Sequence, residues 1–404
     1  MSIAGNSNLS AARSAKNDEF FTQWADIERE MNAYLEYDPD VFRDKVVLLP
    51  CDDPEWSNFA KFFALHFVDF GIKKLISTSY APDSNPAGQF YSPTLFETAD
   101  PKYDASKTRL NGKKFVLEPN DINEDGVVNI DDLQWEYLEG SGDFQSEEVT
   151  KLRDEADVII TNPPFSLFRQ FLTWLNEGGK TYSIIGSGNA VTYKDVFALI
   201  KANKMWKGAT GNSSDMVFGV PKGVPVKAAD KAKAERLGYP SNEKYDYTRL
   251  GNSCWFTNID HGRRHEPLQL MSMEDNLRFS RHKDLRGSRY LTYDNYDAID
   301  VSYIDAIPGD YDGVMGVPIT FLDKYNPDQF EILSLTQTWS DLPTKKYPAQ
   351  VLVDADGNRK VVGALNSSTA IKVDTPPIGK PYFEIDGEYF ISTYKRILVR
   401  RKDL

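Results

Sequence analysis

The chain has 404 residues, 41% of them hydrophobic, and a formal net charge of −13. This length and apolar content suffice for one large core or two smaller ones, so they exclude a disordered chain, and no apolar run approaches the ~20 residues of a membrane span. Because Cys51 and Cys254 are the only cysteines, a fold built on a disulfide framework is excluded as well.

The first half of the chain alternates between strand-like and helix-like segments. Residues 46–49 form an apolar run typical of a buried strand, phenylalanines at helical spacing follow, and residues 75–78 predict a second strand. This order predicts a βαβ unit with a parallel sheet.

A second helix is predicted after the apolar strand at 158–160. Ser166 lies near its start, and Gly178 and Gly179 end it. Residues 182–186 predict the next strand. The apolar stripe of this helix is expected to be core and consists of Leu167, Phe168, Phe171, Leu172 and Leu175.

From about residue 266 the pattern changes to short strand-like segments separated by Gly, Pro, Asn and Asp. We therefore expect two domains, an α/β domain at 1–265 with an acidic insertion at 118–135, and a smaller β-rich domain at 266–404. The chemistry is expected in the first, because ligand sites of α/β sheets lie outside the carboxyl ends of the strands.

The most informative segment is Asn162-Pro163-Pro164-Phe165, which follows the predicted strand at 158–160. Two successive prolines make a stiff turn whose preceding carbonyls stay out of a helix ladder. An Asn held there is a rigid acceptor beside an aromatic face, which suits a planar amino group such as that of a nucleobase. An ordinary strand-to-helix loop with Pro at the first helical position is the alternative.

Residues 156–168 as a whole resemble motif IV of the amino-group DNA methyltransferases, in the form typical of the EcoRI-methylase-like family of adenine-specific enzymes. Residues 16–23 look like the family's motif X and residues 142–144 like its motif III, and 255–258 and 316–325 also look familial. The resemblance implies a Rossmann-like methyltransferase sheet with helices on both faces, dependent on S-adenosylmethionine. It also implies methylation of adenine N6 at a specific site in double-stranded DNA, with 266–404 as the target-recognition domain.

In that activity the expected catalytic residues are Asn162, Pro163, Pro164 and Phe165. Asn162 Oδ1 and the Pro163 carbonyl would accept the two N–H groups of the target amine and draw its nitrogen toward a tetrahedral geometry. The rate gain would come from orientation and electrostatics, without a general base. Phe165 would stack on the adenine, which must leave the duplex to be reached.

The cofactor is expected at the carboxyl end of the first strand. The usual glycine-rich loop is absent, and residues 50–54 read Pro-Cys-Asp-Asp-Pro, similar to an acidic segment of the named family. Asp52 or Asp53 would accept hydrogen bonds from the cofactor, or alternatively cap the following helix. The resemblance assigns Asp143 to the adenine amine of the cofactor and Phe20 or Thr22 to its methionine end. The expected cofactor-binding residues are completed by Cys51, Phe144 and Asn162.

The average charge argues against a nucleic-acid partner, but residues 201–290 carry 17 Lys and Arg against 10 Asp and Glu. Phosphate contacts need a basic face and not a basic protein, although a solvated charged surface is the alternative. The expected DNA-binding residues are Trp255, Arg263 and Arg264.

Two other classes of function stay open. Protein-glutamine methyltransferases use a closely related turn to hold a side-chain amide, and a non-catalytic DNA-binding decoy would keep the same fold. Otherwise we expect a monomeric, cytoplasmic enzyme of a bacterial or phage-infected cell with no membrane partner. It would act in DNA protection or in restriction-modification, in the latter case beside a cognate restriction endonuclease.

The acidic insertion contains oxygen-bearing side chains at calcium-loop spacing. The candidate ligands are Asp121, Asn123, Asp125 and Asp132, with Gly at the sixth position and a shorter carboxylate at the twelfth than an EF-hand has. A structural calcium ion is therefore a hypothesis, and an acidic surface turn is the alternative.

Overall fold

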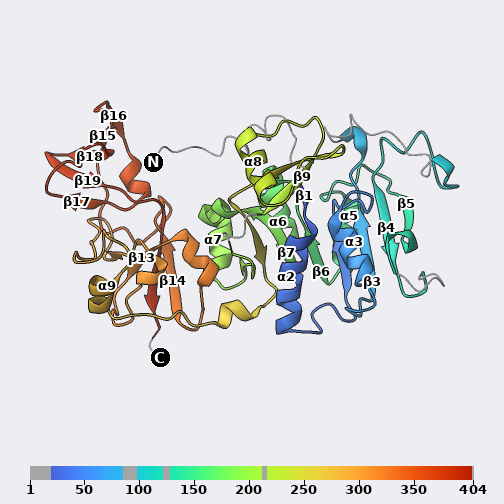
Figure 1. The fold of residues 1–404 in the computed structure, drawn as a ribbon, viewed down its shortest axis with the longest axis horizontal. Helices are drawn as coiled ribbons and strands as arrows, with labels where there is room; N and C mark the ends of the chain where they lie inside the picture. Colours follow the sequence, from blue (N-terminus) through green and yellow to red (C-terminus); the bar gives the residue numbers. More distant parts are fainter. Residues whose placement is uncertain (1–19, 85–97, 122–127, 212–215, 403–404) are drawn as a thin grey trace. The chain divides into compact units, whose positions relative to one another are not determined.

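Figure 1 shows the fold in a computed structural model, which describes residues 20–84, 98–121, 128–211 and 216–402. The chain divides into two compact units, the first made of residues 1–188 and 206–262 and the second of 189–205 and 263–404. The segment 189–205, which lies within the predicted domain 1–265, thus belongs to the second unit. The functional division at 265/266 stays a prediction.

A mixed sheet of eight strands forms the centre of the first unit, in the order β5-β4-β3-β2-β6-β7-β11-β8. Its middle strands are parallel: β3 (Lys74–Thr78), β2 (Val46–Leu49), β6 (Val158–Thr161) and β7 (Thr181–Ser187). The outer strands pair antiparallel: β4 (Lys113–Leu117), β5 (Gln134–Tyr137), β11 (Ser253–Thr257) and β8 (Trp206–Lys207).

The strand order reverses at β2. The chain leaves β2 for β3 on one side and later returns to β6 on the other side. In open α/β sheets, ligands bind at such a switch point, outside the carboxyl ends of the strands. The topology therefore directs attention to the segments that follow β2 and β6.

Helices cover both faces of this sheet. On one face α2 (Trp24–Tyr37) and α3 (Asn58–Leu65) share a core with Val47, Ile160 and Ile185. On the other face α6 (Phe168–Glu177) lies against β7, where a Cβ on Gly186 would meet the Phe168 ring at 2.4 Å. Neighbouring residues of a strand point to opposite faces of the sheet, so Ile185 faces the layer of α2 and α3 and Gly186 faces α6. A further helix, α5 (Glu147–Glu155), precedes β6 and is capped by Ser146.

The strands predicted at 46–49, 75–78, 158–160 and 182–186 are confirmed, and so is the parallel pairing of the first two. The helix after Asn162 is confirmed as α6, and it ends at Gly178. Leu167 was wrongly placed in the core, because it is 37% exposed. A 3-10 turn at Phe165–Leu167 precedes α6, so its N-cap is Leu167. Ser166 lies near the start of the helix, as expected, but is not its N-cap.

A second, three-stranded sheet of the first unit consists of β1 (Phe21–Thr22), β9 (Val217–Pro221) and β10 (Tyr245–Arg249). Both β1 and β10 pair antiparallel with β9. The basic helix α8 (Ala228–Arg236) connects β9 and β10. Pairing with β9 fixes Phe21 and Thr22, which lie in the described part of the segment that looks like motif X.

The second unit contains two sheets, and its predicted β-rich character is confirmed. One has the order β12 (Ile299–Asp300), β13 (Met315–Pro318), β20 (Arg396–Arg401) and β14 (Phe330–Leu335). The other has the order β16 (Arg359–Val362), β15 (Gln350–Val353), β18 (Tyr382–Ile385), β19 (Glu388–Ile391) and β17 (Ile371–Val373). The helices of this unit are α7 (Lys194–Lys201) and α9 (Met273–Phe279).

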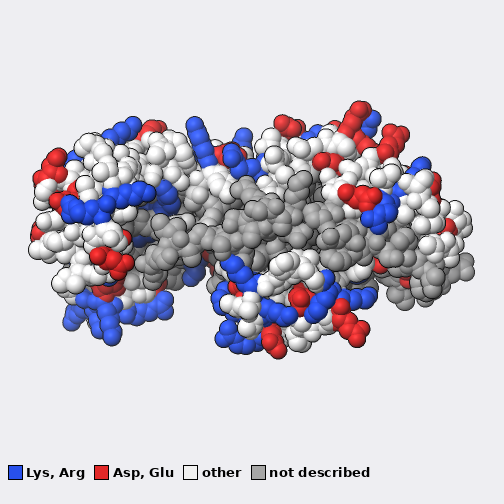
Figure 2. Space-filling model, turned by 90° about the horizontal axis from the view of Figure 1, so that it is seen from above, with Lys and Arg blue, Asp and Glu red and all other residues white. Residues whose placement is uncertain are grey.

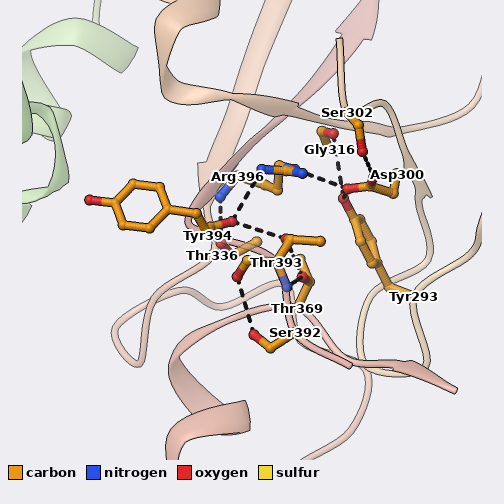
Figure 3. A network of polar contacts seen from close by, with 10 residues as sticks. All are labelled: Tyr293, Asp300, Ser302, Gly316, Thr336, Thr369, Ser392, Thr393, Tyr394 and Arg396. Carbon is orange, nitrogen blue, oxygen red and sulfur yellow. Dashed lines mark hydrogen bonds and ion pairs between the residues drawn. The ribbon is translucent and has the colours of Figure 1, made fainter. Parts of the chain in front are cut away.

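A buried ion pair connects the strands of the first of these sheets (Figure 3). Arg396 Nε lies 2.9 Å from Asp300 Oδ1, which also accepts a hydrogen bond from the Tyr293 hydroxyl at 2.6 Å. Ser302 Oγ donates to the second carboxylate oxygen at 2.5 Å. Since both oxygens are hydrogen-bonded, the network stabilises one arrangement of β12 and β20.

Among the described residues, no helix combines the length and the apolar character that crossing a bilayer would require.

Candidate active site

The predicted catalytic turn begins where β6 ends, next to the loop that leaves β2. Thr161 is the last residue of β6, and Asn162 follows it. On the neighbouring strand β2 ends at Leu49 and leads into Pro50, Cys51 and Asp52. The topology thus brings together two of the sequence segments that were expected to hold the target amine and the cofactor.

Asn162 is fixed by one hydrogen bond and offers a free acceptor. Its Nδ2 donates to the backbone carbonyl of Phe20 at 2.6 Å. Its Oδ1 is buried, and no described residue donates a hydrogen bond to it. A buried acceptor without a donor is unfavourable by about 1–3 kcal/mol, so its presence marks a position where a ligand's N–H would be stabilised.

The two prolines keep this turn out of the helix. Pro164 has φ −52° and ψ 123°, and its carbonyl accepts the N–H of Leu167 at 2.9 Å, which closes the 3-10 turn. The carbonyl of Pro163 is not the acceptor of that hydrogen bond. The Pro163 carbonyl, which is the second acceptor expected for the target amine, therefore takes no part in the hydrogen bond that closes the 3-10 turn.

Phe165 belongs to a cluster of three aromatic rings. Its ring stacks on that of Phe20 with centroids 5.7 Å apart and an interplanar angle of 27°, and it meets Phe218 of β9 edge to face at 6.3 Å. Phe20 and Phe218 also pack on each other at 6.0 Å. Phe165 is only 7% exposed, so in this arrangement the partly buried Phe20 covers one face of the ring that was expected to stack on a base.

The segment at 20–22 supplies a second unpaired polar atom. Thr22 is 3% exposed, and its Oγ1 has no hydrogen-bond partner among the described residues. Its backbone carbonyl accepts from Asn58 Nδ2 at 2.8 Å, which ties β1 to the start of α3. Phe20 and Thr22 therefore lie beside Asn162 and α3, as a role near the cofactor requires.

The loop after β2 has an unusual backbone. Cys51 has φ +66°, a conformation that non-glycine residues adopt rarely and that clusters at functional sites. Its N–H donates to Thr78 Oγ1 at 3.2 Å, so the ends of β2 and β3 are joined. Asp53 is half-buried, and its Oδ1 accepts from the backbone N–H of Glu55 at 2.9 Å.

Asp52 is engaged by the protein itself. It is 6% exposed, and its two carboxyl oxygens are bonded at 2.6 Å by Ser57 Oγ and at 2.6 Å by Thr161 Oγ1. Burial raises the pKa of Asp52 to about 7. Each oxygen of this carboxyl group thus already has a side-chain partner, and direct binding of the cofactor by Asp52 stays a prediction.

Asp143 lies near the ends of β2 and β3. Its Oδ2 is 3.4 Å from the hydroxyl of Tyr80, two residues beyond β3, and its Oδ1 accepts from Gln145 N at 2.8 Å. Burial raises the pKa of Tyr80, and the negative charge of Asp143 raises it further. A Cβ on Gly142, with φ +83°, would meet the Ser79 carbonyl at 2.2 Å, so only glycine allows this approach.

Phe144 is in the core. It is 2% exposed and packs on Phe171 at 5.0 Å and Trp174 at 5.6 Å, both in α6. A direct role of its ring in cofactor binding was therefore the wrong expectation. The ring anchors the loop that carries Asp143.

Two of the three expected DNA contacts were wrong. Trp255 is 0% exposed and packs on Phe59 of α3 at 5.9 Å. Arg264 is 6% exposed, and its Nη2 donates to Asn203 Oδ1 at 2.5 Å. Arg263 is exposed, and its contact with DNA stays a prediction.

The basic stretch 201–290 is divided between the two units. In the first unit, Lys231 and Lys222 lie 2.7 and 3.0 Å from Asp246 Oδ1, and the hydrogen bond from Lys231 is the main cause of the strongly lowered pKa of Asp246. Figure 2 shows Lys and Arg in several groups with Asp and Glu between them, not in one basic patch.

The predicted calcium loop lies partly outside the described residues, because Asn123 and Asp125 fall in 122–127. Asp132 is buried, and its Oδ2 accepts from the N–H of Asn129 at 3.0 Å in a capping box. Asp121 Oδ2 accepts from the N–H of Glu118 at 2.8 Å. In the part of the chain that the structure describes, no cluster of three or more metal-ligating side chains is found.

The described residues fit S-adenosylmethionine by their chemistry. The cofactor carries an ammonium group, an adenine amine and ribose hydroxyls, all of which donate hydrogen bonds. The carboxylates of Asp53 and Asp143 and the unpaired Thr22 hydroxyl are acceptors on segments that adjoin the switch point. Sequence reasoning missed Tyr80 and Phe218, because neither residue lies in a segment that resembles a motif.

Proteins similar to this chain are methyltransferases. The family model described as "Adenine-specific methyltransferase EcoRI" matches residues 8–402. The chain is 39% identical to the Type II methyltransferase M.EcoRI of Escherichia coli over 82% of this chain and 89% of that protein. It is 33% identical to the Type II methyltransferase M.MpnI of Mycoplasma pneumoniae over 87% of this chain and 93% of that protein.

A third relative is the Type II methyltransferase M.MgeORF184P of Mycoplasma genitalium, 31% identical over 88% of this chain and 95% of that protein. No solved structure matches the chain. The match covers nearly the whole chain and includes the Asn-Pro-Pro-Phe turn. The chain therefore belongs to the EcoRI family of adenine-specific methyltransferases, as the resemblance of that turn predicted.

Proposed function

We propose that this methyltransferase transfers a methyl group from S-adenosylmethionine to N6 of an adenine that is flipped out of duplex DNA at a specific site. The observation that carries the proposal is the buried Oδ1 of Asn162, to which no residue of the described part of the chain donates and which is held in place by the hydrogen bond from Nδ2 to the Phe20 carbonyl. The orientation of the amide follows from that bond, because a carbonyl can only accept.

The target amine would donate to Asn162 Oδ1 and to the carbonyl of Pro163. The lone pair of an adenine amine is delocalised into the ring, so two acceptors that bind both N–H groups favour the tetrahedral geometry in which the lone pair is localised. These acceptors are fixed before the substrate arrives and need no reorganisation during the reaction. No general base is required, because the nitrogen loses its proton after it has been methylated.

The cofactor would be held by the segments around the switch point. Asp53 and Asp143 are the proposed acceptors for its donors, and Thr22 and Phe20 would lie at its methionine end. When bound there, S-adenosylmethionine supplies the electrophilic methyl group. The chain's own residues would orient the amine and exclude water from it, and the partly buried Phe20 ring, backed by the buried Phe165 and Phe218 rings, would form the apolar wall on which the flipped adenine would lie.

The division of labour between the two units is also part of the proposal. The central sheet of the first unit would be a Rossmann-like methyltransferase sheet, with its ligands at the switch point. The β-rich second unit would recognise the target sequence, and Arg263 would contact phosphate. We propose that the enzyme acts as a monomer on DNA in the bacterial cytoplasm, in restriction-modification beside a cognate endonuclease, or in DNA protection.

The test is a labelling experiment with methyl-labelled S-adenosylmethionine and, in parallel, duplex DNA or total cell protein. The expected result is label in DNA, recovered as N6-methyladenine, at one sequence that sequencing of DNA from expressing cells identifies. Label in protein would instead show a glutamine methyltransferase. DNA binding without label in either substrate would show a decoy, and both outcomes would contradict the proposal.

A further inference from the structure

The loop after β2 and the amine-binding turn after β6 are joined by one buried carboxyl group, that of Asp52. Thr161 Oγ1 lies 2.6 Å from Asp52 Oδ2 and 2.7 Å from the carbonyl oxygen of Pro50. Ser57 Oγ lies 2.6 Å from Asp52 Oδ1 and accepts the N–H of Phe59 at 3.0 Å as the N-cap of α3. The Ser77 hydroxyl at the end of β3 donates to the backbone carbonyl of Asp52.

These distances fix the number of protons in the network. A threonine hydroxyl has one proton, and it faces two oxygens at hydrogen-bond distance. The Pro50 carbonyl has no proton to donate. If Asp52 were ionised, one of the two short oxygen–oxygen contacts of Thr161 would have no proton between its atoms and would be repulsive. Both contacts are favourable only when Thr161 donates to Pro50 and a protonated Asp52 donates to Thr161.

The surroundings support the protonated form. Asp52 is 6% exposed, and burial raises its pKa to about 7. The groups that contact it from α3, β3 and β6 are hydroxyls, and the charged group that acts on it is Asp53 in its own loop, whose negative charge raises the pKa further. The neutral acid that satisfies the network is therefore the main form of Asp52 below a pH of about 7.

We propose that Asp52 is a positioning residue that acts as a neutral acid: by donating to Thr161 it holds the Asn162-Pro163 turn at a fixed place relative to the cofactor loop at 50–53. The inference rests on the proposed function, because it assigns Asp53 to the cofactor side and Asn162 to the amine side. Asp52 touches neither ligand and controls their relative placement. It replaces the earlier expectation that Asp52 binds the cofactor.

Variants of Asp52, Thr161 and Asp53 test whether Asp52 carries a proton that it donates to Thr161. In Asp52→Asn the amide Nδ2 can donate to Thr161 and Oδ1 can accept from Ser57, so this variant imitates the protonated acid. Thr161→Val keeps the shape of the side chain and removes the hydroxyl, and Thr161→Ser restores the hydroxyl. Asp53→Asn is the matched control, because it neutralises the adjacent carboxylate in the same loop.

The measurements are kcat at saturating DNA and cofactor, cofactor affinity by calorimetry, and the pH profile of kcat. Thr161→Val should lower kcat about 10–100-fold, since small misplacements have effects of this size, with cofactor affinity within about twofold, and Thr161→Ser should restore kcat. In the wild type, kcat should fall as the pH rises through about 7, because Asp52 loses its proton. Asp52→Asn should keep kcat near the wild-type value and should not show this fall. Asp53→Asn should weaken cofactor binding and keep the fall of kcat, moved to a lower pH because the negative charge of Asp53 no longer raises the pKa of Asp52.

A second readout does not depend on activity. The pKa of Asp52 is raised in the folded state from 3.8 to about 7, so the folded protein binds the extra proton, and its contribution to stability is lost as the pH rises through about 7. The melting temperature of the wild type should therefore fall relative to that of Asp52→Asn as the pH rises from 3.8 to about 7. If the protein did not methylate DNA at all, this difference would still be expected.

Two results would overturn the inference. The first is a pH dependence of stability that is the same in the wild type and Asp52→Asn. The second is a loss of cofactor affinity in Asp52→Asn like that of Asp53→Asn, which would return Asp52 to the cofactor site.

Discussion

Asn162→Ala should remove turnover and leave the fold intact. The variant loses one of two preorganised acceptors for the target amine, and removal of one such group typically lowers kcat about 10²–10³-fold, or about 2.7–4 kcal/mol. Cofactor affinity should be nearly unchanged, because the acceptor acts on the amine in the transition state.

The effect on stability is the less obvious part of this prediction. The variant loses the 2.6 Å hydrogen bond to the Phe20 carbonyl, which is favourable by about 0.5–1.5 kcal/mol. It also removes a buried acceptor without a partner, which is unfavourable by about 1–3 kcal/mol. The two terms oppose each other, so the melting temperature should stay within about 4 °C of the wild type or rise.

Asn258 provides the matched control. Its Oδ1 accepts from Tyr182 N at 2.7 Å and its Nδ2 donates to the Lys180 carbonyl at 2.9 Å, so both ends of the amide are satisfied. Asn258→Ala should therefore lower the melting temperature and spare turnover. Single-turnover methylation, cofactor calorimetry and thermal melting measure the three quantities. Near-normal turnover in Asn162→Ala, or a loss of stability like that of Asn258→Ala, would refute the reasoning.

Three further predictions follow from the same structure. Phe165→Ala should lower stability by about 3–5 kcal/mol, because the ring is only 7% exposed; a denaturant midpoint equal to that of the wild type would show that the ring is not core. Arg263→Glu should reduce the salt dependence of DNA affinity by about 0.9 in log–log slope if it loses one phosphate contact, whereas Arg264→Glu should lower stability because that side chain is buried; an unchanged slope would place the phosphate contact elsewhere. If the loop from Asp121 binds calcium, the ion should raise the melting temperature of the wild type and not of Asp121→Ala, and the absence of any calcium effect would remove the hypothesis.

The conformation of the turn at Asn162 could be predicted from the sequence because it is set locally, whereas its catalytic role stays a prediction. An Asn before two prolines at a strand end has few conformations available, and the structure holds Asn162 as that pattern requires. The central strands were also predictable, since buried parallel strands are short apolar runs. Resemblance added the family and the expected cofactor, which the residues alone did not establish.

What the sequence could not predict were contacts between distant segments. Trp255 was expected on the surface because it lies near basic residues, yet the pairing of β11 with β7 and β8 buries it. Arg264 was expected to contact DNA, and its hydrogen bond to Asn203, 61 residues away in the sequence, could not be predicted. The proton count at Asp52 needs Thr161 and Pro50 to be side by side, which depends on the pairing of β2 with β6.

The membership of helix α7 in the second unit has a consequence for synthesis on the ribosome. The ribosome releases α7 between two parts of the first unit, but α7 belongs with residues 263–404, and its Phe197 packs on Trp339. The apolar face of α7 therefore has no packing partners in the second unit until well over a hundred further residues have been synthesised. Strand β20 lies between β13 and β14, so the four-stranded sheet of this unit closes only after residues 396–401 have been synthesised. During that interval the nascent chain exposes apolar surface, and we expect it to be a substrate for chaperones that bind such segments.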